Sequence, residues 1–287
     1  MLEKYIFFHF SLVFFYTKNM ARMTDPQHDL FTFAFCGPRE ACFERVHLKK
    51  LADLADEENW TSKDNDGHNF DILFYYVIKT FEVISKQNKI SYSNNNDFAL
   101  FNTGLLTENG EEIYGYFELN QVPNAQKWYF KGFAKESDRL FCNKVFNKPS
   151  IAQYDKNIEE FHFDSGAEIE LNADHIFDGH WDDDRFPSEV KSLGKQLAIA
   201  SIQSAFQITK KKIRRNPRLA VPQYYDGKIM FLLPVKISVV GSKTVTMALA
   251  VEKMESGIYR ANTIFDLPSA YKKARLMTKP ESNWLIE

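Results

Sequence analysis

The chain has 287 residues, of which 44% are hydrophobic and 15% are aromatic, and this supports a sizeable buried core. Its 36 Lys and Arg residues nearly balance its 38 Asp and Glu residues, so no overall field attracts nucleic acid or an anionic membrane, and such a partner must meet a local patch. Three cysteines without a C-x-x-C pair argue against a disulfide framework and a zinc ribbon, and they favour a reducing cytoplasm.

Residues 1–22 are more apolar than the residues that follow them. The run from Tyr5 to Tyr16 resembles the h-region of a secretory signal, but no small-x-small cleavage site follows it. At roughly 12 residues it is also too short for a bilayer, which takes about 20. We interpret residues 1–22 as a non-core leader or as translated upstream sequence, with Met20 or Met23 as the start; membrane attachment and cleaved export are the alternatives.

Two helices are predicted in the first third of the chain. Apolar residues recur near helical spacing from Glu40 onward, after an alternating stretch of phenylalanines, and this predicts a helix that ends near Glu58. Residues 61–69 are a loop by composition. Residues 70–89 contain an apolar stripe broad enough for a mostly buried helix.

A three-stranded meander is predicted next, because the hydrophobic period changes from 3.6 to 2 after residue 96. Strands at 98–101 and 112–117 flank Asn109-Gly110, a strong hairpin signal since both residues tolerate positive φ. The third strand is expected to begin at Trp128 and to close at Lys131-Gly132. Beyond it, residues 134–187 are polar, with strand-like pieces only at 161–163 and 169–171.

The strongest helix prediction covers residues 188–216. Ser188 can cap it and Pro217 marks its end. Its expected core stripe consists of Leu193, Leu197, Ile199, Ile202, Phe206 and Ile208. Three β-rich runs then form a second meander, and residues 267–277 form a closing helix. We therefore predict an α+β fold, with antiparallel sheets built from two β-meanders and packed with about four helices, as a single domain over residues 27–287.

The common catalytic signatures are missing. The chain has no P-loop, no G-x-G-x-x-G, no H-E-x-x-H and no G-x-S-x-G, which makes nucleotide hydrolysis and a Rossmann fold poor interpretations. One segment gathers the ligand types that divalent cations use: His175, Asp178, His180, Asp182, Asp183 and Asp184. Their spacing does not fit one helix face or one strand face cleanly, and the simpler interpretation is a solvated acidic loop that precedes a helix. We expect no cofactor, with a divalent metal as the alternative.

A dense basic cluster follows the third helix. It comprises Lys210, Lys211, Lys212, Arg214, Arg215 and Arg218. Lys and Arg that neutralise phosphates are the main sequence-independent source of affinity for nucleic acid, and the nearby Tyr224 and Tyr225 are of the type that stacks on bases. The simpler interpretation is a cationic helix end, which the helix dipole favours.

A polar step interrupts the first strand of the hairpin at Asn102-Thr103-Gly104. Asn and Gly are depleted in strands, so the step marks either a place where a ligand approaches closely or a β-bulge whose side chains replace lost ladder bonds. We group Asn102 and Thr103 with three further polar residues as candidates for one pocket: Gln223, Asn262 and Arg275. Arg275 reads equally well as a surface cation of the closing helix.

Several blocks in this order resemble a family of unknown function that is often found beside cold-shock or LOTUS RNA-binding modules. The blocks include FNTGL at 101–105, AVPQYY at 220–225, LLP at 232–234, ALAVE at 248–252 and YRANTI at 259–264. The similarity covers residues 30–287, and it implies an RNA-related setting through those neighbouring modules, without an activity. This chain has no cold-shock or LOTUS module of its own.

These observations lead to three hypotheses. The first is an RNA or other nucleic-acid binding module, with the six cations on phosphates and Tyr224 and Tyr225 stacking on bases. The second is an enzyme acting on RNA or nucleotides, with His175 as acid or base and Arg275 holding a phosphate beside Asn102. The third is a protein-interaction module, for which we find no residue-level signal. A membrane partner is not expected.

Overall fold

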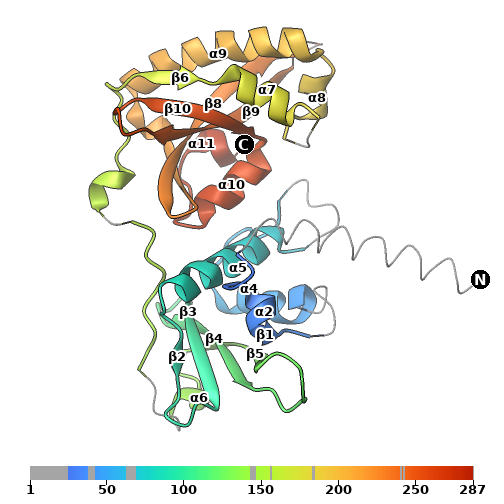
Figure 1. Cartoon of the computed structure of the whole chain (residues 1–287), viewed down its shortest axis with the longest axis vertical. Coiled ribbons are helices and arrows are strands. Elements are labelled where there is room, and N and C mark those ends of the chain that lie inside the picture. Colours follow the sequence, from blue (N-terminus) through green and yellow to red (C-terminus); the bar gives the residue numbers. More distant parts are fainter. Residues whose placement is uncertain are drawn as a thin grey trace, which may run out of the picture. The chain divides into compact units, whose positions relative to one another are not determined.

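The computed structural model describes residues 25–37, 43–62, 69–142, 147–155, 157–182, 185–239, 241 and 243–286. Contacts divide the chain into two compact units, Met1–Gln153 and Tyr154–Glu287, and each contains one five-stranded sheet (Figure 1). The α+β class and the two β-meanders are thereby confirmed. The interpretation of residues 1–22 lies outside the described residues.

The first unit contains one long helix and a sheet with the strand order β1-β5-β4-β3-β2. Its elements are α2 (Leu30–Phe33), β1 (Ala34–Phe35), the π-helical turn η1 (Phe43–Leu48), α4 (Lys49–Leu54), α5 (Asp71–Lys86), β2 (Ser91–Tyr92), β3 (Phe98–Leu106), β4 (Glu112–Leu119), β5 (Trp128–Lys135) and α6 (Arg139–Cys142). β3, β4 and β5 form the predicted meander, and β1 adds a parallel edge beside β5.

Phenylalanine rings fill the space between α5 and this sheet. Phe81 of α5 meets Phe101 of β3 edge to face, with ring centroids 5.2 Å apart, and Phe117 and Phe130 continue the cluster across β4 and β5. Gly115 makes room for it, because a Cβ there would lie 2.0 Å from the Phe101 ring. Aromatic edge-to-face pairs add about 0.5–1.5 kcal/mol beyond burial, so this cluster anchors the unit.

The polar step in β3 forms a large β-bulge. Asn102 pairs with Tyr114 and Leu106 pairs with Glu112, so three residues of β3 lie opposite Ile113 alone. Thr103 Oγ1 donates to the Ile113 carbonyl at 2.7 Å, and Asn102 Oδ1 accepts from the Gly104 amide at 2.9 Å. These side chains replace bonds that the interrupted ladder cannot make, and Gly104 supplies the φ of +74° that the bulge requires.

A second bulge corrects the expected end of the third strand. β5 does not close at Lys131-Gly132 but continues to Lys135, with a register shift at Tyr116/Phe117 that leaves one extra residue in β5. Gly132 sits in this bulge with φ of +134°. A glycine in a strand thus marks an irregularity of the strand rather than its end.

The second unit contains a sheet with the strand order β6-β10-β9-β8-β7, in which β7 to β10 follow one another directly along the chain. Its elements are η2 (Ile158–Phe161, a 3₁₀ turn), β6 (Ile169–Leu171), α7 (Ala173–His180), α8 (Ser188–Lys191), α9 (Lys195–Arg215), η3 (Pro217–Leu219, also 3₁₀), β7 (Val221–Tyr225), β8 (Lys228–Ser238), β9 (Thr244–Lys253), β10 (Tyr259–Phe265), α10 (Leu267–Arg275) and α11 (Asn283–Ile286). The strand-like piece at 161–163 is wrong, and the one at 169–171 is confirmed as β6, which runs parallel to β10.

Helices cover both faces of this sheet (Figure 1). On one face, α7, α8 and α9 pack against residues such as Phe231 and Leu233 of β8. On the other face, α10 and α11 pack against Leu232 of β8 and Ala250 of β9. We call these the α9 face and the α10 face. Because successive strand residues point to opposite faces, every sheet position belongs to one of these two surfaces.

The long helix differs from its prediction in its start and in its buried face. It begins at Lys195, because Gly194 has φ of +77° and separates it from the short α8. Leu197 and Ile208, expected in the core, are 55% and 53% exposed. The face that contacts the sheet instead consists of Ala198, Ile202, Ala205, Phe206, Thr209 and Ile213. Small and polar residues at helical spacing define the stripe as much as the large apolar ones.

Gly104→Ala is expected to lower the free energy of unfolding by about 1–3 kcal/mol. The alanine would have to adopt φ of +74°, and its Cβ would lie 3.0 Å from the Tyr76 hydroxyl. Urea unfolding monitored by tryptophan fluorescence measures the change. Gly110→Ala is the matched control, since Gly110 has φ of +78° with no atom near the new Cβ. Equal losses in both variants would show that the Tyr76 contact adds nothing.

Glu82→Gln is expected to make the free energy of unfolding less dependent on pH in the acidic range. Burial works to raise the pKa of Glu82, but hydrogen bonds from Lys79 and Lys86, at 2.8 and 2.7 Å, outweigh it and hold the pKa below its ordinary value. A depressed folded pKa stabilises the protein above the unfolded pKa of about 4.3, and this is lost as pH falls through the folded pKa.

The variant should therefore be less stable by about 1 kcal/mol at pH 7, and the difference should shrink as pH falls below about 4. Urea unfolding at a series of pH values from 7 to 3 measures this. Glu118→Gln serves as control, because Glu118 pairs with Lys131 at 3.4 Å while both side chains are much more exposed than that of Glu82. If Glu82→Gln is destabilised by the same amount from pH 7 to pH 3, the lowered pKa of Glu82 is contradicted.

Candidate nucleic-acid interface

The last two turns of α9 and the η3 turn after them present five exposed cations: Lys211, Lys212, Arg214, Arg215 and Arg218. We call these five residues the cation cluster. At 100° per residue, Lys211, Lys212, Arg214 and Arg215 fan over an arc of about 160°. Ile213, fully buried in the same turn, points the opposite way, into the α9-face core. The packing of the helix thus directs the cluster toward solvent.

Lys210 has a different role from the other five predicted cations. Its Nζ donates to the backbone carbonyl of Ile169 at 3.0 Å and lies 5.5 Å from the centre of the Phe206 ring. The side chain is partly buried and ties the helix end to β6. Sequence alone does not separate this lysine from its neighbours, because the distinction depends on where β6 lies.

The cluster is not neutralised by the carboxylates that the structure describes. α9 contains no acidic residue, and none of the cluster's five side chains forms an ion pair with a described Asp or Glu. Arg215 Nη1 donates to the Lys211 carbonyl at 2.8 Å, which is a contact within the same turn and leaves the guanidinium without a carboxylate partner among the described residues. A helix dipole is equivalent to only about half a negative charge at this end, so five cations exceed what it requires.

Tyr224 and Tyr225 lie on opposite faces of the sheet. Tyr224 pairs with Ile229, which packs on the α9 face, and its ring meets Tyr154 edge to face at 5.0 Å. Tyr225 is 60% exposed on the α10 face, with Lys273 Nζ 5.7 Å from its ring centre. The pair therefore cannot form one stacking platform, and Lys273 is a neighbour that sequence reasoning missed.

The predicted pocket residues are divided between the two compact units. Asn102 and Thr103 belong to the first unit, each is 1% exposed, and their polar atoms serve the bulge; Asn102 Nδ2 also donates to the Pro149 carbonyl at 3.3 Å. Asn262 is the extra residue of a bulge in β10 and accepts from Asn172 Nδ2 at 3.0 Å. Within the second unit, Gln223 shares a surface with Arg275.

Gln223 and Arg275 both lie on the α10 face. Gln223 follows Val221 in strand alternation, and Val221 packs with Ala270 and Ala274 of α10. Arg275 is 8% exposed at the end of α10, so it is not the surface cation that its sequence context allowed. His175 is exposed on α7, a helix of the α9 face. The sheet thus separates the two residues proposed for catalysis.

The acidic segment is a helix rather than a loop up to His180. α7 places Ile176 and Phe177 in the core and leaves Asp178 outside, paired with Lys195 Nζ at 2.9 Å. No three His, Cys, Asp or Glu residues in the described part of the chain are arranged to hold a metal ion. Asp183 and Asp184, two of the six candidate ligands, lie outside the described residues.

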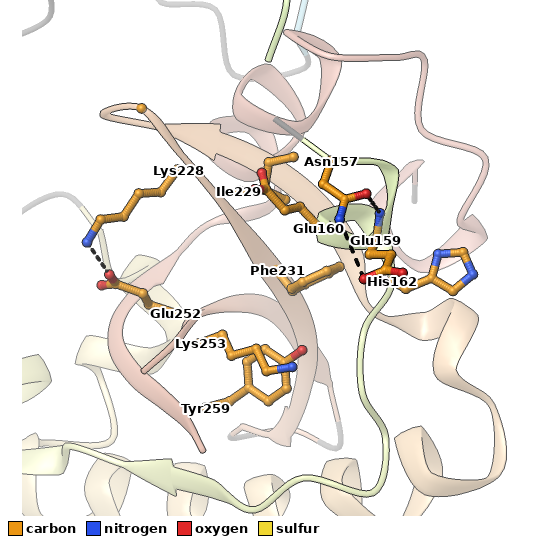
Figure 2. A pocket seen from close by; sticks show the side chains of 11 residues that line it. Asn157, Glu159, Glu160, His162, Lys228, Ile229, Phe231, Glu252, Lys253 and Tyr259 are labelled. Atoms are coloured by element: carbon orange, nitrogen blue, oxygen red, sulfur yellow. Dashed lines mark hydrogen bonds and ion pairs between the residues drawn. The ribbon is translucent and has the colours of Figure 1, made fainter. Parts of the chain in front are cut away.

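One pocket of the second unit combines segments that no sequence motif connects. It has a volume of about 390 Å³ and lies between η2, the turn from β7 to β8, the end of β9 and the start of β10 (Figure 2). Its lining residues are Asn157, Glu159, Glu160, His162, Gly227, Lys228, Ile229, Phe231, Glu252, Lys253 and Tyr259. We call this the η2 pocket. None of these residues was a sequence candidate.

Two lining residues have altered pKa values. A hydrogen bond from Lys228 Nζ to Glu252 Oε1, at 2.6 Å, raises the pKa of Lys228, so this lysine stays cationic at neutral pH. Burial raises the pKa of Tyr259, whose hydroxyl accepts from the Asp164 amide at 3.1 Å. The Tyr259 ring stacks on Phe163 at 4.4 Å, which makes it part of the wall rather than a free reactive group.

Comparison with known proteins gives a family but no function. A family model described as a domain of unknown function, DUF3825, matches residues 51–284 and thus extends over parts of both compact units. Neither the curated proteins nor the solved structures contain a significant match. Every helix in the part of the chain that the structure describes is too short or too polar for a membrane span. The extent of one domain over residues 27–287 stays a prediction.

Gln223→Met is expected to leave the free energy of unfolding unchanged or to raise it by up to about 1 kcal/mol. Gln223 is 2% exposed, and its Oε1 accepts no hydrogen bond from the residues that the structure describes. Replacing it by an apolar side chain of similar shape removes an unsatisfied buried acceptor. Chemical unfolding measures the change, with Gln203→Met on the exposed side of α9 as control. A loss above about 1 kcal/mol would show that the amide has a partner.

Proposed function

Because the chain belongs to the DUF3825 family, whose function is unknown, its role must be inferred from its own residues, and we propose that it binds single-stranded RNA through the cation cluster. The cluster contacts successive phosphates, and the affinity depends strongly on salt because each contact releases counterions. The resemblance to a family found beside cold-shock and LOTUS modules favours RNA over DNA. A cytoplasmic location belongs to the same proposal and agrees with the buried free thiol of Cys36.

One observation carries this proposal: five exposed cations lie at the end of α9 and in the η3 turn after it, without an ion pair to any described carboxylate. Bringing charges of the same sign together is unfavourable, so such a surface is best satisfied by a polyanion. The net charge of the chain, −2, cannot supply this attraction, which makes the local patch the relevant feature. Lys210 and Tyr224 are not part of this surface, because Lys210 bonds to the Ile169 carbonyl and the Tyr224 ring packs on Tyr154.

Tyr225 and Lys273 form a second, separate contact for the same strand. The tyrosine is 60% exposed and the ammonium of Lys273 lies 5.7 Å from its ring centre, so a base stacked on the ring would have a cation beside its phosphate. These two residues lie across the sheet from α9, so the RNA must pass around an edge of the sheet to reach both contacts.

The enzyme hypothesis has less support than the binding hypothesis. It required His175 and Arg275 to converge with Asn102, whereas the described structure places His175 and Arg275 on opposite sides of one sheet and engages Asn102 in a bulge. A role in binding a protein partner has no specific observation in its favour.

The triple variant Lys211→Gln/Arg214→Gln/Arg215→Gln is expected to bind single-stranded RNA about tenfold or more weakly at 50 mM salt. The slope of log affinity against log salt concentration should be less negative by about 2, since each lost phosphate contact on a single strand changes this slope by about 0.7. Filter-binding titrations of a 15-nucleotide RNA at several salt concentrations between 50 and 200 mM measure both quantities.

The matched control is Lys236→Gln/Lys243→Gln/Lys279→Gln, which changes the net charge equally at exposed lysines outside α9. It should retain nearly the affinity and the salt slope of the unaltered chain. Equal weakening by the two triple variants would attribute binding to net charge, and salt-insensitive binding by the unaltered chain would exclude the phosphate contacts altogether. Either result rejects the proposed function.

A further inference from the structure

The sheet of the first unit has a face turned away from α5, and α6 covers one end of it. Phe117 of β4 and Phe130 of β5 belong to the ring cluster beneath α5, so the residues next to them in each strand point away from that helix. Phe141 of α6 packs on Tyr114 of β4, with ring centroids 5.4 Å apart. We call the part beyond α6 the outer face, and it includes Phe35, Phe98, Tyr116, Glu118, Tyr129 and Lys131.

The half of the outer face at β1 and β5 combines two rings with a cation. Phe35 and Tyr129 are register partners, and their ring centroids lie 5.7 Å apart. Lys131 Nζ lies 5.7 Å from the centre of the Tyr129 ring and 3.4 Å from Glu118 Oε2. Because Glu118 is the register partner of Tyr129, strand alternation and direct contacts place all four side chains on the same side of the sheet.

The other half of the outer face, at β3 and β4, is a stacked pair of rings. Phe98 is the register partner of Glu118 and so shares its face. The Phe98 ring stacks on Tyr116, with centroids 5.7 Å apart and an interplanar angle of 19°. Phe98 is fully buried and Tyr116 is half-buried, so Tyr116 is the ring of this pair that reaches solvent. The rings that reach solvent thus come from three adjacent strands, β1, β5 and β4.

This surface differs from the usual solvated face of an antiparallel sheet, which carries polar side chains. Tyr129 is 40% exposed, and Phe35 and Tyr116 are partly exposed. Leu100 and Ala134, which point to the same side, are buried and contribute no aliphatic surface. The exposed apolar area therefore consists of ring faces and edges, which suit stacking on other planar groups.

Lys131 adds the charge that an RNA strand requires. Its ion pair with Glu118 has both side chains about 40% exposed, so water screens the pair and the ammonium remains open to a phosphate. Proteins that bind single strands combine such cations with rings on which successive bases stack. Sheet faces that carry two or three aromatic residues hold single-stranded RNA in this way. The stacking surface that Tyr224 and Tyr225 do not form is thus present in the first unit.

We propose that the outer face is a platform on which bases of single-stranded RNA stack. Tyr129 and Tyr116 stack on bases, Phe35 holds the Tyr129 ring from the side, and the ammonium of Lys131 contacts a phosphate. This assignment deepens the proposed function and rests on it for the ligand. Stacking accepts every base, so the platform adds affinity that depends on the presence of bases, whereas the cation cluster responds to phosphates.

The test compares ordinary RNA with an abasic strand of the same length, which keeps every phosphate and lacks every base. Tyr129→Ala is expected to bind ordinary RNA about tenfold more weakly, because one base loses its stacking partner. Its affinity for the abasic strand and its salt dependence should not change. Tyr129→Phe keeps the ring and should bind both strands like the unaltered chain. Filter-binding titrations of both strands measure these affinities.

Tyr92→Ala is the matched control, because it removes a ring of similar exposure, 43%, from outside the outer face. Tyr92 pairs with Ala99, and Ala99 pairs with Phe117, which places Tyr92 on the side of α5. This variant should retain the affinity for ordinary RNA. The proposal is wrong if Tyr129→Ala binds ordinary RNA as tightly as the unaltered chain, or if Tyr92→Ala loses as much affinity as Tyr129→Ala.

A second measurement does not depend on the folding of any variant. Irradiation of the unaltered chain with RNA that carries 5-iodouridine couples this base to an aromatic ring stacked on it, and mass spectrometry of the peptides identifies the ring. Adducts are expected on Tyr129 or Tyr116. Adducts found only outside the outer face overturn the proposal.

Failure of this inference is distinguishable from failure of the proposed function. The triple variant of the cation cluster should weaken the binding of ordinary and abasic strands by similar factors, since both carry the same phosphates. If the unaltered chain binds both strands equally and in a salt-dependent way, the platform is rejected and the proposed function stands. If it binds neither strand, the proposed function is rejected and the platform with it.

Discussion

The burial of Ile213 against the sheet determines what the second unit presents to solvent. This side chain and Phe206 pack into the α9-face core and thereby fix the orientation of the helix about its own axis. The side chains on either side of Ile213 therefore point toward solvent. The exposure of the cations at the helix end is thus a consequence of apolar packing. Changing Ile213 to a polar residue would alter the surface without touching any cation.

The polar step in β3 shows how a motif can suggest chemistry while serving the backbone. Asn102 and Thr103 are buried, and their side-chain atoms bond to backbone groups around the bulge. Tyr76 Oη donates to the Thr103 carbonyl at 2.9 Å, which links α5 to the same irregularity. Buried backbone groups must be paired, so a bulge needs side chains with both donors and acceptors, and this alone accounts for the residue types.

Local signals predicted the parts of the fold that depend on local interactions. The Asn109-Gly110 hairpin, the helix in residues 70–89 and the second meander agree with the structure, because turn chemistry and hydrophobic period are properties of neighbouring residues. The parallel edge strands β1 and β6 have two and three residues, too few for any period to be read. Their existence depends on partners that lie about ninety residues away in the chain.

The candidate site also contains features that the sequence predicts and features that only the fold reveals. The cations of α9 are adjacent in sequence, so their clustering was predictable, while the withdrawal of Lys210 and the separation of Tyr224 from Tyr225 required the positions of β6 and β7. The η2 pocket draws on segments near residues 160, 228, 252 and 259, and nothing in any one of them indicates the others. Sites assembled across a sheet leave no trace in a linear pattern.

The parallel pairing of β6 also has a kinetic consequence. Its three residues join Tyr259–Ala261 only after a loop of some ninety residues has closed, whereas β8, β9 and β10 are connected by short turns. The contacts of β6 therefore form after the meander, and, being few, they are the first of this sheet to open. Since Lys210 is bonded to β6, the order of assembly makes the docking of this edge strand the step that completes the end of α9.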